Sequence, residues 1–163
     1  MRSGRKDINM LAEQKMNELG INLPKVPKVV GIYSQYRSFG QNLVYISGCG
    51  TAINGQDTYL GKLGRDLTID EGKDAAKNCM LNALAVIKAN IGNLDNIKYF
   101  VKVLGFVAST DDFYDQPEVV NGATKLLSDI FGEQVGVGAR SAIGTNVLPG
   151  NIPVEIEFLL ELK

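Results

Sequence analysis

The segment from residue 154 to 162 constrains the fold most strongly. Apolar and other residues alternate strictly along it, which predicts a β-strand with two different faces. One face is apolar and the other carries three acids; the apolar set is Val154, Ile156, Phe158, Leu160 and Leu162, and the acids are Glu155, Glu157 and Glu161. A face with three carboxylates is not ordinary core. We therefore treat this strand as one wall of a candidate site.

A second strand is expected just before it, ahead of a loop rich in Asn, Pro and Gly. Arg140 stands at the start of that strand, between small residues. If the two strands pair across a loop centred near Leu148, Arg140 lies close to Glu155. A guanidinium is a planar, permanently charged fork that grips carboxylates, so Arg140 is a candidate for binding an acid. The simpler alternative is a structural Arg–Glu pair that only ties the two strands together.

Two long helices are expected in the middle of the chain. Thr68 and Glu71 form a capping box that opens a helix over residues 69–91, which ends at a glycine. Pro117 suits the first turn of a second helix, expected to end near Phe131. Two long helices cover only one face of a single sheet. The other face is therefore predicted to be buried by self-association.

Other strands are expected at residues 29–36, 43–47 and 96–108, where apolar residues are frequent. Within the second long helix, Asn121 and Gly122 are poor helix formers in the second turn. Such residues indicate a close contact between elements or a site at that point.

The N-terminal part is expected to form an arm that packs against the main domain. Asp7 can cap a helix that runs to about Leu19, and the proline-containing stretch that follows must be extended. We therefore divide the chain into a helical arm, residues 1–27, and a domain, residues 28–163.

Composition excludes several chemistries. The 163 residues include two cysteines and no histidine, and the net charge is −1. Serine–histidine and cysteine–histidine catalysis, and the usual zinc and haem ligand sets, are therefore excluded, and we expect no metal and no cofactor. The charge balance gives no general attraction to nucleic acid or membranes. Without a signal-like or membrane-spanning segment, the protein is expected to be cytoplasmic.

Several separated motifs resemble the YjgF/RidA family, also described as the endoribonuclease L-PSP family. They occur in the family's order and spacing over roughly residues 28–162. The loop Gly144–Pro153 and the added N-terminal helix resemble the longer, chorismate-mutase-like branch. The motifs are Tyr33-Ser34-Gln35, Asn42–Gly48, Val119–Ala123, Arg140-Ser141-Ala142, Leu148-Pro149 and Pro153–Glu157.

This resemblance implies a chorismate-mutase-like α+β fold, with a mixed sheet and two long helices on one face. It also implies a homotrimer with three clefts between subunits. The implied reaction is hydrolysis of reactive enamine or imine intermediates to a 2-keto acid and ammonia. Carried over by position, Arg140 would hold the substrate carboxylate and Glu155 would help to place the attacking water. The residues expected to line the cleft are Tyr33, Ser47, the Gly48 backbone and Asn121.

Three positions depart from the deaminase pattern of the family. Ala142 replaces a cysteine, Cys49 replaces a glutamine, and Gly144 replaces an acidic residue. A second hypothesis is therefore a trimeric protein that binds a small carboxylate metabolite without turnover. A third, an endoribonuclease or translation inhibitor, has little support, because the chain lacks histidine and a basic stripe.

Overall fold

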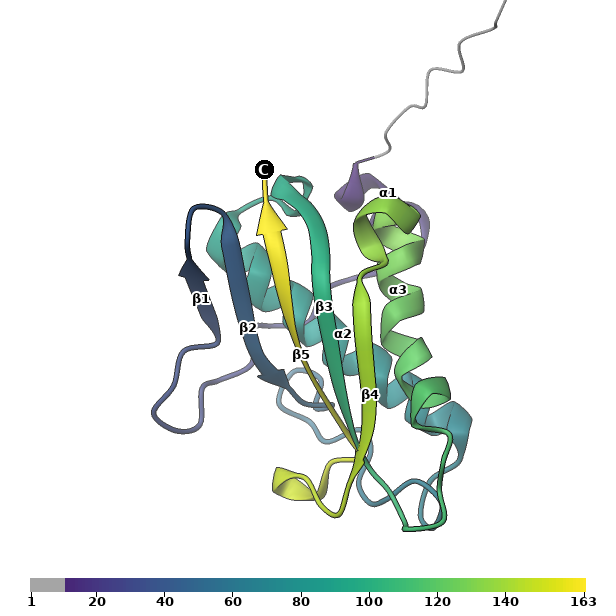
Figure 1. Cartoon of the computed structure of the whole chain (residues 1–163). Coiled ribbons are helices and arrows are strands. Elements are labelled where there is room, and N and C mark those ends of the chain that lie inside the picture. Colours follow the sequence, from purple (N-terminus) through teal and green to yellow (C-terminus); the bar gives the residue numbers. More distant parts are fainter. Residues whose placement is uncertain (1–10) are drawn as a thin grey trace, which may run out of the picture.

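A computed structural model describes residues 11–163, which form a five-stranded sheet with helices behind it (Figure 1). The strand order is β1-β2-β5-β3-β4. Only β3 and β4 are parallel; the other neighbours are antiparallel. The strands are β1 (Tyr36–Phe39), β2 (Leu43–Cys49), β3 (Ile97–Ala108), β4 (Ala139–Thr145) and β5 (Val154–Leu162).

Two long helices, α2 (Ile69–Ile91) and α3 (Gln116–Gly136), lie together on one face of this sheet (Figure 1). The helix α3 connects β3 to the parallel strand β4, as a crossover connection must. The predicted α+β fold, with a mixed sheet and two long helices on one face, is confirmed. No helix within residues 11–163 is long and apolar enough to cross a membrane.

The capping box at the start of α2 has the expected geometry. The Glu71 amide donates to Thr68 Oγ1 at 3.3 Å, and the Glu71 carboxylate accepts from the Thr68 amide at 2.8 Å. At the other end, Gly92 has a φ of 79°, which stops the helix as predicted. The limits of α2 could therefore be derived from local residues alone.

The helix α3 is longer than predicted. Gly132 has a φ of 75° and interrupts it, but a further turn continues to Gly136. This turn persists because Val135 packs against the core. The unusual residue Gly122 marks a helix crossing, since a Cβ there would overlap the Lys73 carbonyl of α2.

A short helix, α1 (Ala12–Glu18), lies within the segment that was predicted to form an N-terminal arm. The Ala12 amide donates to Asp95 Oδ1 at 2.6 Å, so the start of α1 is held by a distant part of the chain. Ala12 and Met16 are buried, so one face of α1 packs against the core. The proposed cap, Asp7, lies outside the described residues.

The strand predicted at residues 29–36 is wrong, because β1 begins only at Tyr36. Residues 29–35 form a loop whose apolar side chains are largely exposed; Val30 is 85% exposed. The loop is closed by Gln35, whose Nε2 donates to the Pro27 carbonyl at 2.9 Å. Gly31 has a φ of 126°, which an extended strand does not accommodate.

The predicted hairpin of the last two strands is also wrong. The strand β3 lies between β4 and β5 and pairs with both. Phe106 of β3 therefore has Ile143 on one side and Glu155 on the other. Because a crossover through α3 precedes β4, that strand takes the sheet edge beside β3. Residues 146–153 then cross the end of β3 to reach β5.

Candidate functional site

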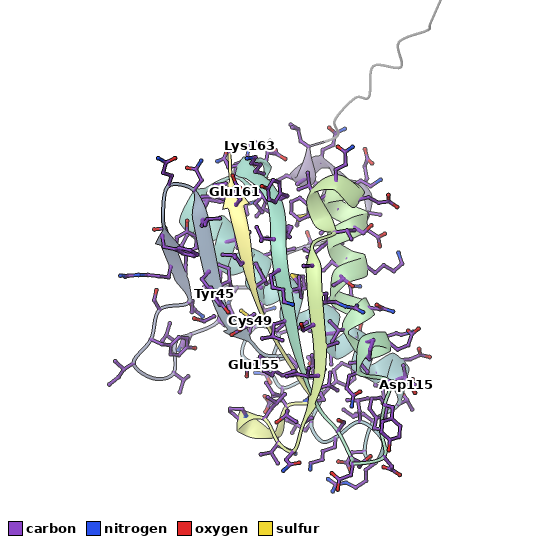
Figure 2. The ribbon with its side chains drawn as sticks, viewed as in Figure 1. Tyr45, Cys49, Asp115, Glu155, Glu161 and Lys163 are labelled. Carbon is purple, nitrogen blue, oxygen red and sulfur yellow. The ribbon has the colours of Figure 1, made fainter. Side chains whose placement is uncertain are left out.

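The acids of β5 face away from the helices, but only one of them lacks a partner. Tyr45 donates its hydroxyl to Glu157 at 2.7 Å, and Lys98 pairs with Glu161 at 2.7 Å. Figure 2 shows where Tyr45, Glu155 and Glu161 lie on the sheet. Glu155 has no hydrogen bond or ion pair within residues 11–163. Its pKa is raised, first by burial and then by the charge of Glu157. Glu155 is therefore the acid of this face that is available for chemistry.

Gly48 lies directly against the Glu155 carboxylate. A Cβ at this position would overlap Glu155 Oε1, so the site requires a glycine there. The β2–β5 register shifts between Ile46 and Cys49, which places the backbone of Gly48 in this bulge. A side chain at position 48 would therefore have to displace the Glu155 carboxylate.

The loop before β1 is joined to the same region. Ser47 donates its hydroxyl to the Ser34 carbonyl at 2.6 Å. Tyr33, 48% exposed, lines with Gly48 a pocket of about 170 Å³. Four of the six predicted site residues therefore lie together in the structure: Tyr33, Ser47, Gly48 and Glu155.

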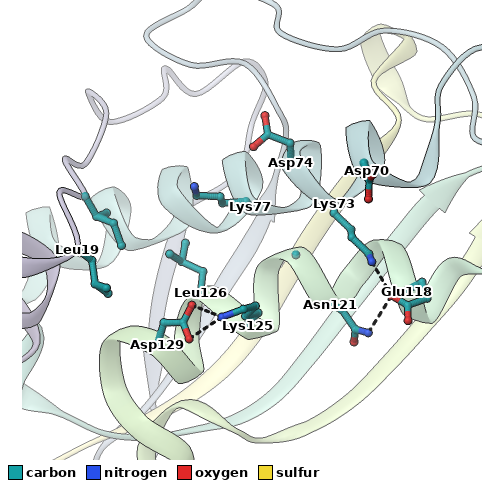
Figure 3. A pocket seen from close by; sticks show the side chains of 12 residues that line it. Leu19, Asp70, Lys73, Asp74, Lys77, Glu118, Asn121, Lys125, Leu126 and Asp129 are labelled. Carbon is teal, nitrogen blue, oxygen red and sulfur yellow. Dashed lines mark hydrogen bonds and ion pairs between the residues drawn. The ribbon is translucent and has the colours of Figure 1, made fainter.

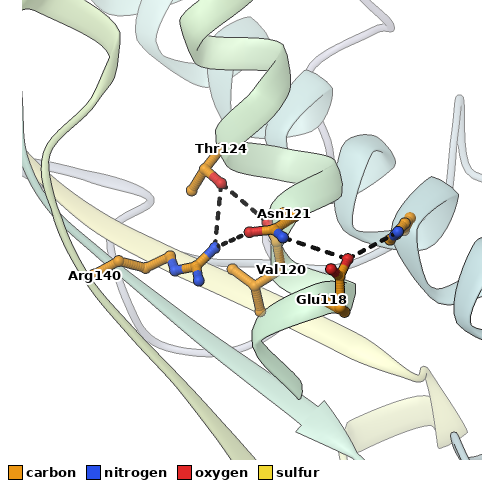
Figure 4. Close-up of polar contacts among 6 residues, drawn as sticks. Glu118, Val120, Asn121, Thr124 and Arg140 are labelled. Atoms are coloured by element: carbon orange, nitrogen blue, oxygen red, sulfur yellow. Dashed lines mark hydrogen bonds and ion pairs between the residues drawn. The ribbon is translucent and has the colours of Figure 1, made fainter. Parts of the chain in front are cut away.

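The remaining two, Arg140 and Asn121, form a separate group at the edge of the sheet. Arg140 Nη1 donates to Asn121 Oδ1 at 2.6 Å and to Thr124 Oγ1 at 3.3 Å (Figure 4). The Asn121 amide in turn donates to Glu118 at 3.4 Å, which fixes its orientation. The guanidinium is thus anchored through one nitrogen. Nη2 and Nε of Arg140 have no partner within residues 11–163 and remain available to a carboxylate.

The two groups are too far apart to hold one small ligand. Arg140 points toward α3, whereas Glu155 lies on the opposite face of the sheet. Glu155 is level with Ile143 of β4, and Arg140 is three residues before Ile143. Their Cα atoms are therefore about 10 Å apart along the strands and about 10 Å apart across them. The predicted contact between Arg140 and Glu155 is absent, both as a binding site and as a structural pair.

The positions that depart from the family pattern offer no nucleophile. Ala142 and Gly144 lie on the same side of β4 as Arg140, and Gly144 lies against Gln116 of α3. Burial raises the pKa of the Cys49 thiol to about 12, with a further contribution from Glu155. The fully buried Cys79 directs its sulfur to the Val154 carbonyl at 3.3 Å. Neither cysteine supplies a thiolate at neutral pH.

Sequence reasoning missed Glu118, which accepts from the Asn121 amide, and Thr124, which accepts from Arg140. The three-residue spacing of polar side chains on α3 could have indicated this row. Asn121 also borders a groove of about 650 Å³ between α2 and α3 (Figure 3). Two ion pairs lie along it, Lys73 with Glu118 at 2.9 Å and Lys125 with Asp129 at 2.7 Å, whereas Asp70 and Lys77 have no ion pair within residues 11–163.

Within residues 11–163, no cluster of three or more His, Cys, Asp or Glu could hold a metal ion. The chemistry available to the described residues is therefore that of a guanidinium, a carboxylate with a raised pKa, amides, hydroxyls and water.

Among curated relatives, "Protein TCP17" of Trypanosoma cruzi is 37% identical over 148 residues, covering 91% of this chain and 92% of its own. A Dermatophagoides farinae protein named 2-iminobutanoate/2-iminopropanoate deaminase is 28% identical over 144 residues, covering 88% of this chain and 95% of its own.

Two solved structures show how the fold compares. A candidate endoribonuclease from Shewanella oneidensis has a TM-score of 0.88 at 31% identity and covers 93% of this chain and 99% of its own. RidA from the Antarctic bacterium Psychrobacter sp. PAMC 21119 has a TM-score of 0.59 at 27% identity, covering 85% and 94%. The sheet and helices thus follow the Shewanella protein more closely than this RidA.

The family model that matches this chain is described as "YjgF/chorismate mutase-like, putative endoribonuclease", and it covers residues 13–162. With a fold shared along the same range, the chain belongs to the YjgF/RidA family.

Proposed function

We propose that this protein is an imine deaminase that works in clefts between the subunits of a homotrimer. Its substrates would be 2-imino acids and their enamine tautomers, which water converts to a 2-keto acid and ammonia. Two groups of residues, here called half-sites, carry the proposal. One contains Arg140, a cation with unused donors at the sheet edge, and the other contains Glu155, an acid on the open face with no partner among the described residues.

The chemistry requires little more than these two groups. Arg140 binds the substrate carboxylate through Nη2 and Nε, which fixes the C=N carbon. Glu155 takes a proton from water as the oxygen attacks that carbon, and passes this proton to the nitrogen. As the resulting carbinolamine collapses, Glu155 transfers the hydroxyl proton to the nitrogen, the C–N bond breaks, and the 2-keto acid and ammonia are released. Burial and the charge of Glu157 raise the pKa of Glu155, which makes its carboxylate a stronger base toward the attacking water.

The cleft must be shared by two copies, because one copy holds Arg140 and Glu155 on opposite faces of the sheet. A ring of three copies would bring the β4 edge of one copy to the β2–β5 face of the next. The apolar residues on the open face support such an interface. Tyr45, Tyr99 and Ile143 are 43%, 37% and 46% exposed in the single chain.

The names of two relatives support this reaction class. The Dermatophagoides farinae relative bears the name of an imine deaminase, and the Psychrobacter protein bears the name RidA. No observation on this chain favours RNA cleavage in the same way, since the half-sites hold no paired basic groups.

The test is keto-acid release from an imine generated in place by a dehydratase. Wild type is expected to accelerate hydrolysis over buffer alone, and Arg140→Ala and Glu155→Gln are each expected to reduce kcat/KM by at least about 100-fold. Arg37→Ala and Glu161→Gln are matched controls, because they remove the same charges outside the half-sites.

An absence of acceleration by wild type would overturn the proposal. If a small carboxylate then binds to wild type and not to Arg140→Ala, the protein is a carboxylate-binding member of the family without turnover.

A further inference from the structure

The Arg140 guanidinium is held by neutral groups. Its Nη1 donates to Asn121 Oδ1 and to Thr124 Oγ1, the carbonyl oxygen of an amide and the oxygen of a hydroxyl (Figure 4). Within residues 11–163, no acid forms an ion pair with Arg140. The cation is therefore anchored to α3 while no bonded carboxylate cancels its charge, which a carboxylate ligand can then use.

An acid nevertheless lies next to this anchor. Glu118 precedes Asn121 by three residues on α3, so the two side chains are neighbours on the helix surface. Glu118 Oε2 accepts a hydrogen bond from Asn121 Nδ2 at 3.4 Å. The hydrogen bond and charge of Lys73 lower the pKa of Glu118, with further contributions from Asn121 and Arg140, so this carboxylate is ionised at neutral pH.

The amide of Asn121 joins the cation and the acid in one orientation only. A guanidinium can only donate hydrogen bonds, and an ionised carboxylate can only accept them. The amide oxygen must therefore face Arg140 and the amide nitrogen must face Glu118, as Figure 4 shows. An aspartate at position 121 would instead place a negative charge on Arg140 and a second one beside Glu118.

Glu118 is fixed in turn by the other long helix. Lys73 Nζ of α2 pairs with the same oxygen, Glu118 Oε2, at 2.9 Å (Figure 3). The backbone of Lys73 lies at the helix crossing, where its carbonyl fills the place of a side chain at Gly122. The contacts Lys73 to Glu118, Glu118 to Asn121 and Asn121 to Arg140 thus connect the helix crossing to the sheet edge.

We propose that Asn121 is a neutral spacer through which Glu118 fixes the Arg140 guanidinium without cancelling its charge. Glu118 and Asn121 are then positioning residues, because they act through Arg140 and not on the substrate. The inference rests on the proposed function for the kind of ligand, a small carboxylate. Its tests use ligand binding and side-chain motion, which do not require turnover.

The first test measures the charge. Calorimetric titration with 2-oxobutanoate is expected to show binding at least about tenfold weaker in Asn121→Asp than in wild type, because the new carboxylate pairs with Arg140 and competes with the ligand. Asp129→Asn is the matched control on α3, since it breaks the ion pair to Lys125 and does not contact Asn121. The control should bind as wild type does.

The second test measures the anchoring. NMR relaxation of the Arg140 Nε–H group, identified by its loss in Arg140→Lys, reports how far the unliganded side chain moves. We expect motion to increase in Glu118→Ala, with about fivefold weaker binding of 2-oxobutanoate. Glu118→Gln should restore both properties, because one amide oxygen can accept the two bonds that now end on Glu118 Oε2. Motion in Asn121→Asp should stay at the wild-type level, although binding is lost.

Two outcomes would overturn the spacer. They are undiminished binding of 2-oxobutanoate in Asn121→Asp, and an Arg140 side chain in Glu118→Ala that is as ordered as in wild type. If the variants behave as expected but wild type hydrolyses no imine, the deaminase proposal fails and the spacer stands. If wild type hydrolyses imines and the order of Arg140 does not depend on Glu118, the reverse holds.

Discussion

At the scale of single residues, Glu155 differs from the other acids of β5, because it has no hydrogen-bond or ion-pair partner among residues 11–163. Glu157 and Glu161 have hydrogen-bonding neighbours, whereas the charge of Glu155 is half-buried and unpaired. A carboxylate in that position costs stability, because burial disfavours its ionised form. A reaction centre requires an unpaired carboxylate of this kind, whereas a structural role does not.

This cost predicts a dependence of stability on pH. The folded-state pKa of Glu155 is raised above its ordinary value of 4.5. The folded protein therefore holds this proton more tightly than the unfolded chain, and its contribution to stability is lost as pH rises above about 4.5. The Glu155→Gln variant has no such loss. The melting temperature of the variant minus that of wild type should therefore increase from pH 4 to pH 7.

Glu161→Gln is the control of opposite sign. Lys98 and Tyr99 lower the pKa of Glu161, so its contribution is present at neutral pH and is lost as pH falls through the lowered value. This variant should be less stable than wild type at pH 7 and should approach it in acid. If the stability difference from wild type changes with pH in the same direction for both variants, the assignment of Glu155 as an unpaired carboxylate is wrong.

Gly48 is the second residue whose role depends on its neighbour. Gly48→Ala must displace the Glu155 carboxylate, since the added methyl group would occupy its position. We expect kcat for imine hydrolysis to fall by about tenfold or more, because a displacement near 1 Å already has effects of this size. In the Glu155→Gln background the same change should have little further effect, which a double-mutant cycle measures.

At the scale of elements, the crossing of α2 and α3 depends on Gly122. The Lys73 carbonyl fills the place of its missing side chain, and a backbone atom cannot turn aside as a side chain can. Gly122→Ala should therefore separate the helices and lower the free energy of unfolding by about 3 kcal/mol, as measured in urea. Gln134→Ala, an exposed change on the same helix, should stay within about 0.5 kcal/mol of wild type.

Elements with local signals were predicted well, and those set by distant partners were not. The capping box and Gly92 define α2, and strict alternation defines β5, because each signal lies inside its own element. The order of strands depends on β3 entering between β4 and β5, which no residue near Arg140 or Glu155 encodes. The six predicted site residues stay a prediction, but the expected contact between Arg140 and Glu155 was wrong, because β3 separates their strands.

At the scale of the whole molecule, the separation of the half-sites predicts that activity belongs to the assembly. Sedimentation or light scattering should find a trimer. In the trimer, each cleft would combine Arg140 and Asn121 from one copy with Tyr33, Ser47, Gly48 and Glu155 from the next. Variants defective in different halves should then complement each other, which a site within one copy would not allow.

Mixing Arg140→Ala with Glu155→Gln therefore tests the architecture directly. After unfolding and refolding together in equal amounts, a cleft is intact only where Arg140 comes from a Glu155→Gln copy and Glu155 from an Arg140→Ala copy. Random assembly around a three-fold ring gives about one quarter intact clefts, so about one quarter of wild-type activity should return. Each variant refolded alone is the control. Recovery no greater than the sum of those controls would place both groups in one copy, against the separation of Arg140 and Glu155 in the sheet.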